Sequence, residues 1–325
     1  MDLMEGIARN DFLIVGRAGM DFFPDPPGTS VEHGAVFHAA LGGSAANTAA
    51  GICKLGGKAA LVTSVSDDAV GRFCLNQLDH YGVDRRHVRS VGGELRNSLA
   101  VYDSRVEGHT TVIYRNGAAD FEMTQDDVAA VDYTAYGALI TAGTVFAAEP
   151  SRGAAFAAFE RARAAGLPII FDVDYRPYSW PGPEVAADVL SRAAAQCDMI
   201  VGNDEEFGFM AGSFDKGLEK ARALAADGRL VVYKMGAEGA ITFFQGRELR
   251  TGIYPVEALK PTGAGDSFMA GLMASLAEGH SLHDALLRGS ACAAVTVSRP
   301  GCAPAMPTRP ELAAFLQGHP GPTDP

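Results

Sequence analysis

Short, continuous apolar runs in this chain alternate with longer stretches of helical spacing. Apolar runs occur at residues 12–16, 60–65, 139–141, 169–172, 199–201 and 230–234, and helical spacing occurs at residues 44–55, 151–165 and 185–196. Short β-rich runs separated by amphipathic helices are typical of a parallel sheet covered by helices on both faces. The pattern therefore predicts an α/β fold, a three-layer α/β/α sandwich with a mostly parallel central sheet.

Two segments interrupt this alternation, residues 17–40 and 94–116, which are poor in helical signal. The second contains β-rich runs at 99–103 and 110–115 joined around Gly108, as in a hairpin. Ligands of parallel sheets gather at the carboxyl ends of the strands. Polar residues that follow a predicted strand are therefore candidates for a site, and they are Asp21, Asp172, Asp174 and Asn203.

Composition and charge narrow the class of protein. The chain has 325 residues, is 47% hydrophobic and carries a formal net charge of −12, which disfavours nucleic acid and anionic membranes as partners. No apolar run approaches the ~20 residues of a membrane helix, and residues 1–10 do not resemble a secretory signal. The five cysteines are scattered and odd in number, which argues against a disulfide framework. We expect a cytoplasmic enzyme.

The most informative segment is residues 261–271, Pro-Thr-Gly-Ala-Gly-Asp-Ser-Phe-Met-Ala-Gly. Small residues that open into an apolar helix allow a ligand close to the unpaired N–H groups of a helix N-terminus, where an anion is favoured. An acid there, Asp266, suits a general base that takes a proton from an attacking hydroxyl. On this short pattern alone an ordinary helix N-cap is the favoured explanation of the same Asp, and the general base is the alternative.

The same segment closely resembles the C-terminal signature of the ribokinase-like (PfkB) family of sugar kinases, and residues 42–57 resemble its N-terminal signature. The resemblance implies a ribokinase-like sandwich in which residues 17–40 and 94–116 form a small β lid over the sugar site. The core would then comprise residues 1–16, 41–93 and 117–318. Residues 319–325 read as a disordered, Pro-rich tail.

The resemblance also implies roles for individual residues. Asp266 would be the base, and the anion-binding loop would be formed by Gly263, Ala264 and Gly265. The nucleotide ATP would lie against Lys234, Gly236, Gly239, Thr262 and Gly265. Magnesium would be held, through water, by Asn203 and Glu206, although an acidic start of a helix also explains that pair. The sugar would contact Asp21, Gly42, Gly43 and Asn47.

The acceptor is less defined by the sequence. Arg115 and Arg176 suggest a carboxylate, and hence a sugar acid, because the guanidinium fork binds carboxylates through two hydrogen bonds; an ion pair with a neighbouring Asp is the alternative for each. Stretches such as Gly-Arg-Ala-Gly-Met-Asp and Asp-Tyr-Arg-Pro-Tyr-Ser-Trp resemble the family's kinases of myo-inositol catabolism, which phosphorylate the terminal hydroxyl of 5-dehydro-2-deoxygluconate. Kinases of 2-keto-3-deoxygluconate, fructose or a nucleoside share the catalytic residues, and a sugar-acid-binding regulator without activity is the rival of another class.

Two further properties are left open by the sequence. A monovalent cation such as K⁺ activates relatives in the family, and the loop at residues 298–302 is the candidate site for it. Lid strands with exposed edges would allow a homodimer through the lid.

Overall fold

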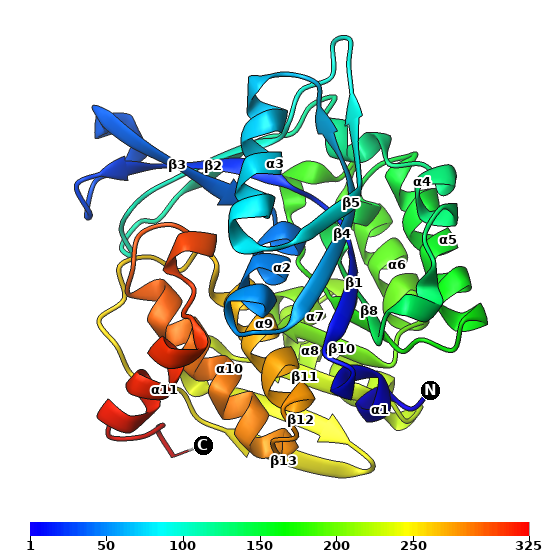
Figure 1. Ribbon diagram of the computed structural model, residues 1–325. Coiled ribbons are helices and arrows are strands. Elements are labelled where there is room, and N and C mark those ends of the chain that lie inside the picture. The colour runs from blue at the N-terminus through cyan, green and yellow to red at the C-terminus, as the bar shows by residue number, and fades with distance from the viewer. Residues whose placement is uncertain (325) are drawn as a thin grey trace.

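The computed structural model describes residues 1–324, and within them the main sheet has nine strands (Figure 1). Their spatial order is β13-β12-β11-β10-β9-β8-β1-β4-β5. The strands are β1 (Asp11–Val15), β4 (Lys58–Ser66), β5 (Asp84–Val91), β8 (Ala138–Ala142), β9 (Ile169–Asp172), β10 (Met199–Asn203), β11 (Leu230–Lys234), β12 (Ala240–Phe244) and β13 (Arg247–Thr251). Neighbours from β5 to β11 pair in parallel, whereas β12 and β13 are antiparallel.

A second sheet of four strands in the described residues projects from the core, in the order β3-β2-β6-β7 (Figure 1). Its strands are β2 (Gly19–Asp25), β3 (Val36–Gly42), β6 (Leu99–Tyr102) and β7 (Thr111–Tyr114). The expected hairpin is β6 paired antiparallel with β7. The predicted α/β architecture with a mostly parallel sheet and a lid sheet is confirmed, while the exact domain boundaries stay a prediction.

Helices cover both faces of the main sheet. The helices are α1 (Leu3–Ala8), α2 (Ser44–Lys54), α3 (Ala69–Tyr81), α4 (Gln125–Ala129), α5 (Ser151–Ala164), α6 (Pro183–Ala194), α7 (Asp204–Met210), α8 (Gly217–Ala226), α9 (Ala264–Ala277), α10 (Leu282–Val297) and α11 (Arg309–Gly318). Side chains alternate along β1, so that Phe12 and Ile14 join the core under α2, α9 and α10, while Leu13 and Val15 join the core under α5 and α6.

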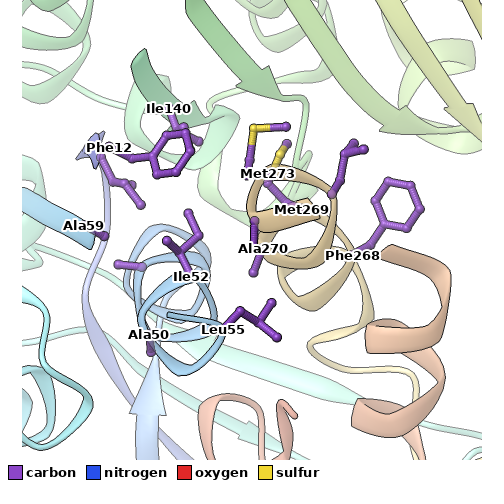
Figure 2. Close-up of a cluster of buried hydrophobic side chains, with 14 of the residues drawn as sticks. Phe12, Ala50, Ile52, Leu55, Ala59, Ile140, Phe268, Met269, Ala270 and Met273 are labelled. Atoms are coloured by element: carbon purple, nitrogen blue, oxygen red, sulfur yellow. The ribbon is translucent and has the colours of Figure 1, made fainter. Parts of the chain in front are cut away.

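Helices α2 and α9 pack closely, although their sequences lie far apart (Figure 2). Ile52 of α2 and Ala270 of α9 belong to one buried cluster with Phe12. A Cβ built on Gly51 would lie only 2.6 Å from the Cβ of Ala270, so the two helices need a residue without a side chain at this crossing. Each of the two signature segments supplies one of these helices. Their packing brings the N-termini of α2 and α9 to the same end of the sheet.

The chain end also makes contacts. Of the tail predicted at residues 319–325, residue 325 lies outside the described residues, and the backbone N–H of Thr323 donates to the carbonyl of Ile253 at 2.7 Å. Among residues 1–324, no helix is both long enough and apolar enough to span a membrane.

The crossing of α2 and α9 generates a stability prediction. Gly51→Ala should lower the free energy of unfolding, because overpacking costs about 1–3 kcal/mol and exceeds the gain of about 1 kcal/mol from replacing a helical Gly. Gly153→Ala in α5 is the matched control, since its new Cβ would meet only the flexible Glu149 side chain at 3.1 Å and Gln125 at 3.6 Å. Urea denaturation of both variants measures the difference. A Gly51→Ala protein as stable as the control would contradict the close packing.

Candidate active site

A cavity of about 660 Å³ lies where the carboxyl ends of β9, β10 and β11 face the lid and the N-terminus of α9. Most residues expected from the sequence line it, namely Asp21, Gly43, Asn47, Arg176, Asn203, Glu206, Lys234, Gly236, Gly239, Thr262, Gly263, Ala264, Gly265 and Asp266. Gly42 and Arg115 are the two expected residues that are absent from its lining in the described structure. Segments as far apart in the chain as Asp21 and Asp266, a separation of 245 positions, therefore meet in one site.

The anion-binding loop precedes α9 directly. Gly263 is the N-cap residue, with a φ of 83° in the left-handed region that favours glycine, and it provides no side-chain cap. In the described residues the N–H of Gly265 has no hydrogen-bond partner, and the N–H of Ala264 makes only a long contact of 3.4 Å to the Pro261 carbonyl, so this helix start is available to an anion. A Cβ built on Gly265 would lie 3.6 Å from the Nζ of Lys234, so an ammonium lies beside this helix end. Dipole and ammonium together favour an anion here.

Asp266 belongs to the first turn of α9 and is not its N-cap, so the N-cap interpretation does not describe this residue, and its role as a base stays a prediction. The Nδ2 of Asn47 donates to its Oδ2 at 2.8 Å. Burial in the cavity raises the pKa of Asp266 to about 6, and the Asp174 carboxylate adds to this shift, while the Asn47 hydrogen bond opposes it. A carboxylate with a pKa near neutrality is suited to general base catalysis.

Asp21 lies at the sugar side of the cavity. A Cβ on Gly42 would overlap the Asp21 carboxylate, so Gly42 makes room for this acid from the neighbouring strand. Burial raises the pKa of Asp21 to about 7, and the nearby Arg17 opposes the shift. The Oδ1 atoms of Asp21 and Asn47 are buried without a hydrogen-bond partner in the described protein. Unpaired acceptors that line a cavity suit a ligand with several hydroxyl groups.

The two expected arginines have different surroundings. Arg176 lines the cavity, pairs with Asp174 at 2.8 Å and donates from Nη1 to the Tyr175 carbonyl at 3.0 Å. Burial disfavours the charge of Asp174, but the Arg176 guanidinium, the Ser44 hydroxyl and the more distant Arg17 and Arg115 together lower the pKa of Asp174. Arg115 instead forms an ion pair with Asp120 and lies away from the cavity lining. The alternative of a structural ion pair therefore describes Arg115.

Arg17 is a cavity residue that the sequence analysis missed. It is buried, lines the cavity, and its Nη1 donates to the Ser98 Oγ at 2.9 Å. The available signal was its place two residues after β1, at the carboxyl edge of the sheet where ligands gather.

Asn203 and Glu206 form a capping box at the start of α7. The backbone N–H of Glu206 donates to the Asn203 Oδ1 at 2.8 Å, and the N–H of Asn203 donates to the Glu206 Oε2 at 2.8 Å. Asp172, at the end of β9, lies on the same cavity wall, and burial raises its pKa to about 8. Among residues 1–324 there is no cluster of three or more His, Cys, Asp or Glu side chains arranged to hold a metal ion.

The lid contacts the anion-binding loop. The Nε2 of His109, in the loop between β6 and β7, lies 3.2 Å from the Thr262 Oγ1 and 3.1 Å from the Thr111 Oγ1. The sequence offered no signal for this contact, because a single His in a hairpin has many possible neighbours. The lid thus covers one side of the cavity.

Comparisons with known proteins agree with this geometry. The model of the pfkB family of carbohydrate kinases matches residues 9–309. A 5-dehydro-2-deoxygluconokinase from Photobacterium profundum is 35% identical over 313 residues, covering 94% of this chain and 95% of that protein. The protein with the same name from Geobacillus thermodenitrificans is 33% identical over 313 residues, covering 94% and 93%.

Two solved structures are similar in fold. A double-mutant fructokinase from Vibrio cholerae O395, with fructose, ADP and potassium ion bound, has a TM-score of 0.81 at 26% identity, covering 94% of this chain and 98% of that one. A putative ribokinase II from E. coli, in complex with ATP and Mg²⁺, has a TM-score of 0.83 at 20% identity, covering 95% and 99%. From the family match, the relatives and the cavity that unites both signature segments, it follows that this chain belongs to the pfkB family of carbohydrate kinases.

Proposed function

We propose that this kinase transfers the γ-phosphate of ATP to the terminal hydroxyl of a sugar acid, with 5-dehydro-2-deoxy-D-gluconate as the acceptor. The observation that carries the proposal is the partly buried Asp266, held by Asn47 at the N-terminus of α9 in a cavity shared with Asp21 and Lys234. The names of relatives at 33–35% identity support this acceptor.

In the proposed mechanism, Asp21, Gly43 and Asn47 hold the acceptor with its terminal hydroxyl at Asp266. Asp266 takes the hydroxyl proton as that oxygen forms a bond to the γ-phosphorus, and the bond from phosphorus to the β–γ bridging oxygen breaks, releasing ADP. The N–H groups of Ala264 and Gly265 and the dipole of α9 stabilise the negative charge on the transferred group.

The nucleotide would occupy the part of the cavity lined by Lys234, Gly236, Gly239, Thr262 and Gly265. Lys234 ends β11, and its ammonium lies beside the start of α9, where the β- and γ-phosphates would need neutralisation. The ADP bound to the Vibrio cholerae fructokinase supports a nucleotide in this family.

The cavity wall formed by Asp172, Asn203 and Glu206 carries oxygen atoms of the kind that bind magnesium. Asp172, Asn203 and Glu206 offer oxygen ligands, but the capping box already engages the Asn203 Oδ1 and the Glu206 Oε2, which favours contact through water. When bound, magnesium would neutralise phosphate charge during transfer. Acids outnumber arginines and lysines along the cavity lining, and a divalent cation would balance this excess.

The sugar-acid assignment depends on Arg176 together with Arg17. Both line the cavity, and each has guanidinium N–H groups beyond those used in the structure: Arg17 makes one hydrogen bond, to Ser98, and Arg176 contacts Asp174 and the Tyr175 carbonyl. A carboxylate on the acceptor could accept hydrogen bonds from these remaining guanidinium N–H groups. Arg115 has no part in this assignment, because it pairs with Asp120 and does not line the cavity.

Pairing of two chains through the lid is also a proposal. β3 and β7 are the edge strands of the lid sheet and expose Val36, Phe37, Val112 and Tyr114, which would be covered in a dimer.

The base assignment predicts that Asp266→Asn lowers kcat by ~10²–10⁴-fold, because the variant cannot accept the proton. Binding of MgATP, measured by calorimetry, should change little. Asp79→Asn, an exposed acid of α3 paired with Arg85, is the matched control and should keep full activity. Turnover of Asp266→Asn within a few-fold of wild type would exclude this residue as the base.

The raised pKa of Asp266 predicts the pH dependence. The carboxylate is the active form, so kcat at saturating substrates should be retained above pH 6 and lost as the pH falls through about 6. Asn47→Leu removes a hydrogen bond that favours the charged form, so the acid limb should move to higher pH. Titration of ATP itself is common to both proteins and cancels in the comparison. Identical acid limbs in the two would argue against Asp266 as the titrating group.

The acceptor is tested by magnesium-dependent ADP release with 5-dehydro-2-deoxygluconate, 2-keto-3-deoxygluconate, fructose, ribose and adenosine. We expect a preference for the first, and Arg176→Ala should raise KM for the sugar acids by ~10–100-fold, the value of a hydrogen-bonded charge. Arg192→Ala, an exposed arginine of α6, is the matched control. An equal rise in KM for fructose in Arg176→Ala would argue against a contact between Arg176 and an acceptor carboxylate. If no acceptor led to ADP release, the alternative of a sugar-acid-binding regulator without activity would be favoured.

A further inference from the structure

Lys260 is a fully buried lysine immediately before the anion-binding loop. Its residue is 1% exposed, and its Nζ donates to the carbonyl of Thr262 at 2.5 Å and to the carbonyl of Thr296 at 3.1 Å. Thr262 lines the cavity next to Gly263, and Thr296 belongs to the last turn of α10. The ammonium therefore ties the start of the anion-binding loop to the C-terminal end of a neighbouring helix.

This position is costly for a charged group. A buried ammonium loses its hydration, and both hydrogen bonds of Lys260 within residues 1–324 go to neutral carbonyls rather than to a carboxylate. Burial lowers the pKa of Lys260, whereas the carboxylates of Asp21 and Asp266 oppose that shift. The last turn of α10 reads Ala-Val-Thr-Val, so the ammonium of Lys260 also supplies the cation that a helix C-terminus favours.

The backbone around Lys260 strengthens the same link. The N–H groups of Leu259 and Lys260 both donate to the carbonyl of Val297, at 2.8 and 3.2 Å. On the other side, Ser267 in the first turns of α9 accepts a hydrogen bond from Thr296 through their hydroxyls at 2.7 Å. The ammonium thus joins the loop to the end of α10, which Thr296 in turn links to the start of α9, and a displacement of Lys260 would move the Thr262 carbonyl.

These contacts bear on the monovalent cation. The Vibrio cholerae fructokinase was solved with a potassium ion, and the loop at residues 298–302 is the expected site in this chain. Directly beside that loop, the carbonyls of Thr296 and Thr262 already coordinate the ammonium of Lys260. A potassium ion at these carbonyls would meet a like charge in a low-dielectric interior, so the residues present do not fit one.

We propose that the ammonium of Lys260 replaces a monovalent cation behind the anion-binding loop. It holds the Thr262 carbonyl in position and adds a fixed positive charge on the side of the loop away from the ligand. Lys260 is a positioning residue, because it acts through the loop and does not line the cavity in the described structure. Its effect on turnover rests on the proposed function, whereas its independence of potassium can be measured on the folded protein alone.

The first test compares the wild-type enzyme in KCl, NaCl and choline chloride at equal ionic strength. Because no cation binds at this site, kcat and the thermal unfolding midpoint should be the same in all three, with kcat within about twofold. Activation by K⁺ well beyond this, or a midpoint raised selectively by K⁺, would overturn the proposal. This comparison decides the question even where substituted proteins fail to fold.

The second test removes the ammonium. Lys260→Ala should lower kcat by ~10–100-fold with little change in the acceptor KM, as expected when a loop near the reacting atoms shifts. KCl or methylammonium chloride should restore part of that loss in Lys260→Ala, which leaves space for a cation. Lys260→Met, which fills the space with an apolar side chain, should not respond. A folded Lys260→Ala protein that no cation rescues, or one with unchanged kcat, would refute the replacement.

Lys54→Met is the matched control. The Nζ of Lys54 also donates to two backbone carbonyls, of Ala303 at 3.1 Å and Pro304 at 3.0 Å, but it lies outside the cavity lining. We expect it to keep kcat and to show no cation response. The unfolding midpoint gives a readout that needs no acceptor: Lys260→Ala should gain more in KCl than in NaCl, while wild type and Lys54→Met should not. A failure of every acceptor would therefore refute the proposed function without deciding the role of Lys260.

Discussion

The site depends on the close approach of α2 and α9. Gly51 and Ala270 allow the two helices to touch along their backbones, and the helices then begin at the same end of the sheet. As a result, Asn47 and Asp266 are joined by a hydrogen bond of 2.8 Å across 219 positions of the chain. Larger side chains at this crossing would move the two helices apart. Asn47 on the sugar side of the cavity and Asp266 on the phosphate side would then separate, because the first belongs to α2 and the second to α9.

The aspartates around this contact differ widely in pKa, although their side chains are chemically the same. Burial raises the pKa of Asp172 to about 8, of Asp21 to about 7 and of Asp266 to about 6. The pKa of Asp174 is lowered instead, because Arg176 and other neighbouring groups together oppose its burial. Environments that separate the pKa values of neighbouring acids separate their chemical roles. The cavity therefore holds a charged Asp174, the partner of Arg176, near Asp266, whose carboxyl group can exchange a proton near neutral pH.

Several elements were predictable because their signals are local. Continuous apolar runs predicted β1, β4, β9, β10 and β11, since strands buried on both faces need no polar side. The glycine-rich loop before α9 was also predictable, because a left-handed residue at a helix start nearly requires glycine, as at Gly263. The capping box of Asn203 and Glu206 is a similar local pattern, and it explains why the competing interpretation of that pair was reasonable.

Sequence alone thus determined the fold class, the lid hairpin and the position of the acid in the anion-binding loop, because periodicity and turn chemistry act over a few residues. Tertiary structure decided which side chains face the cavity. It turned Arg115 toward Asp120, brought Arg17 to the cavity wall and buried Lys260 behind the loop. These outcomes depend on packing between segments far apart in the chain, and the identity of a charged residue does not reveal which partner packing will bring to it.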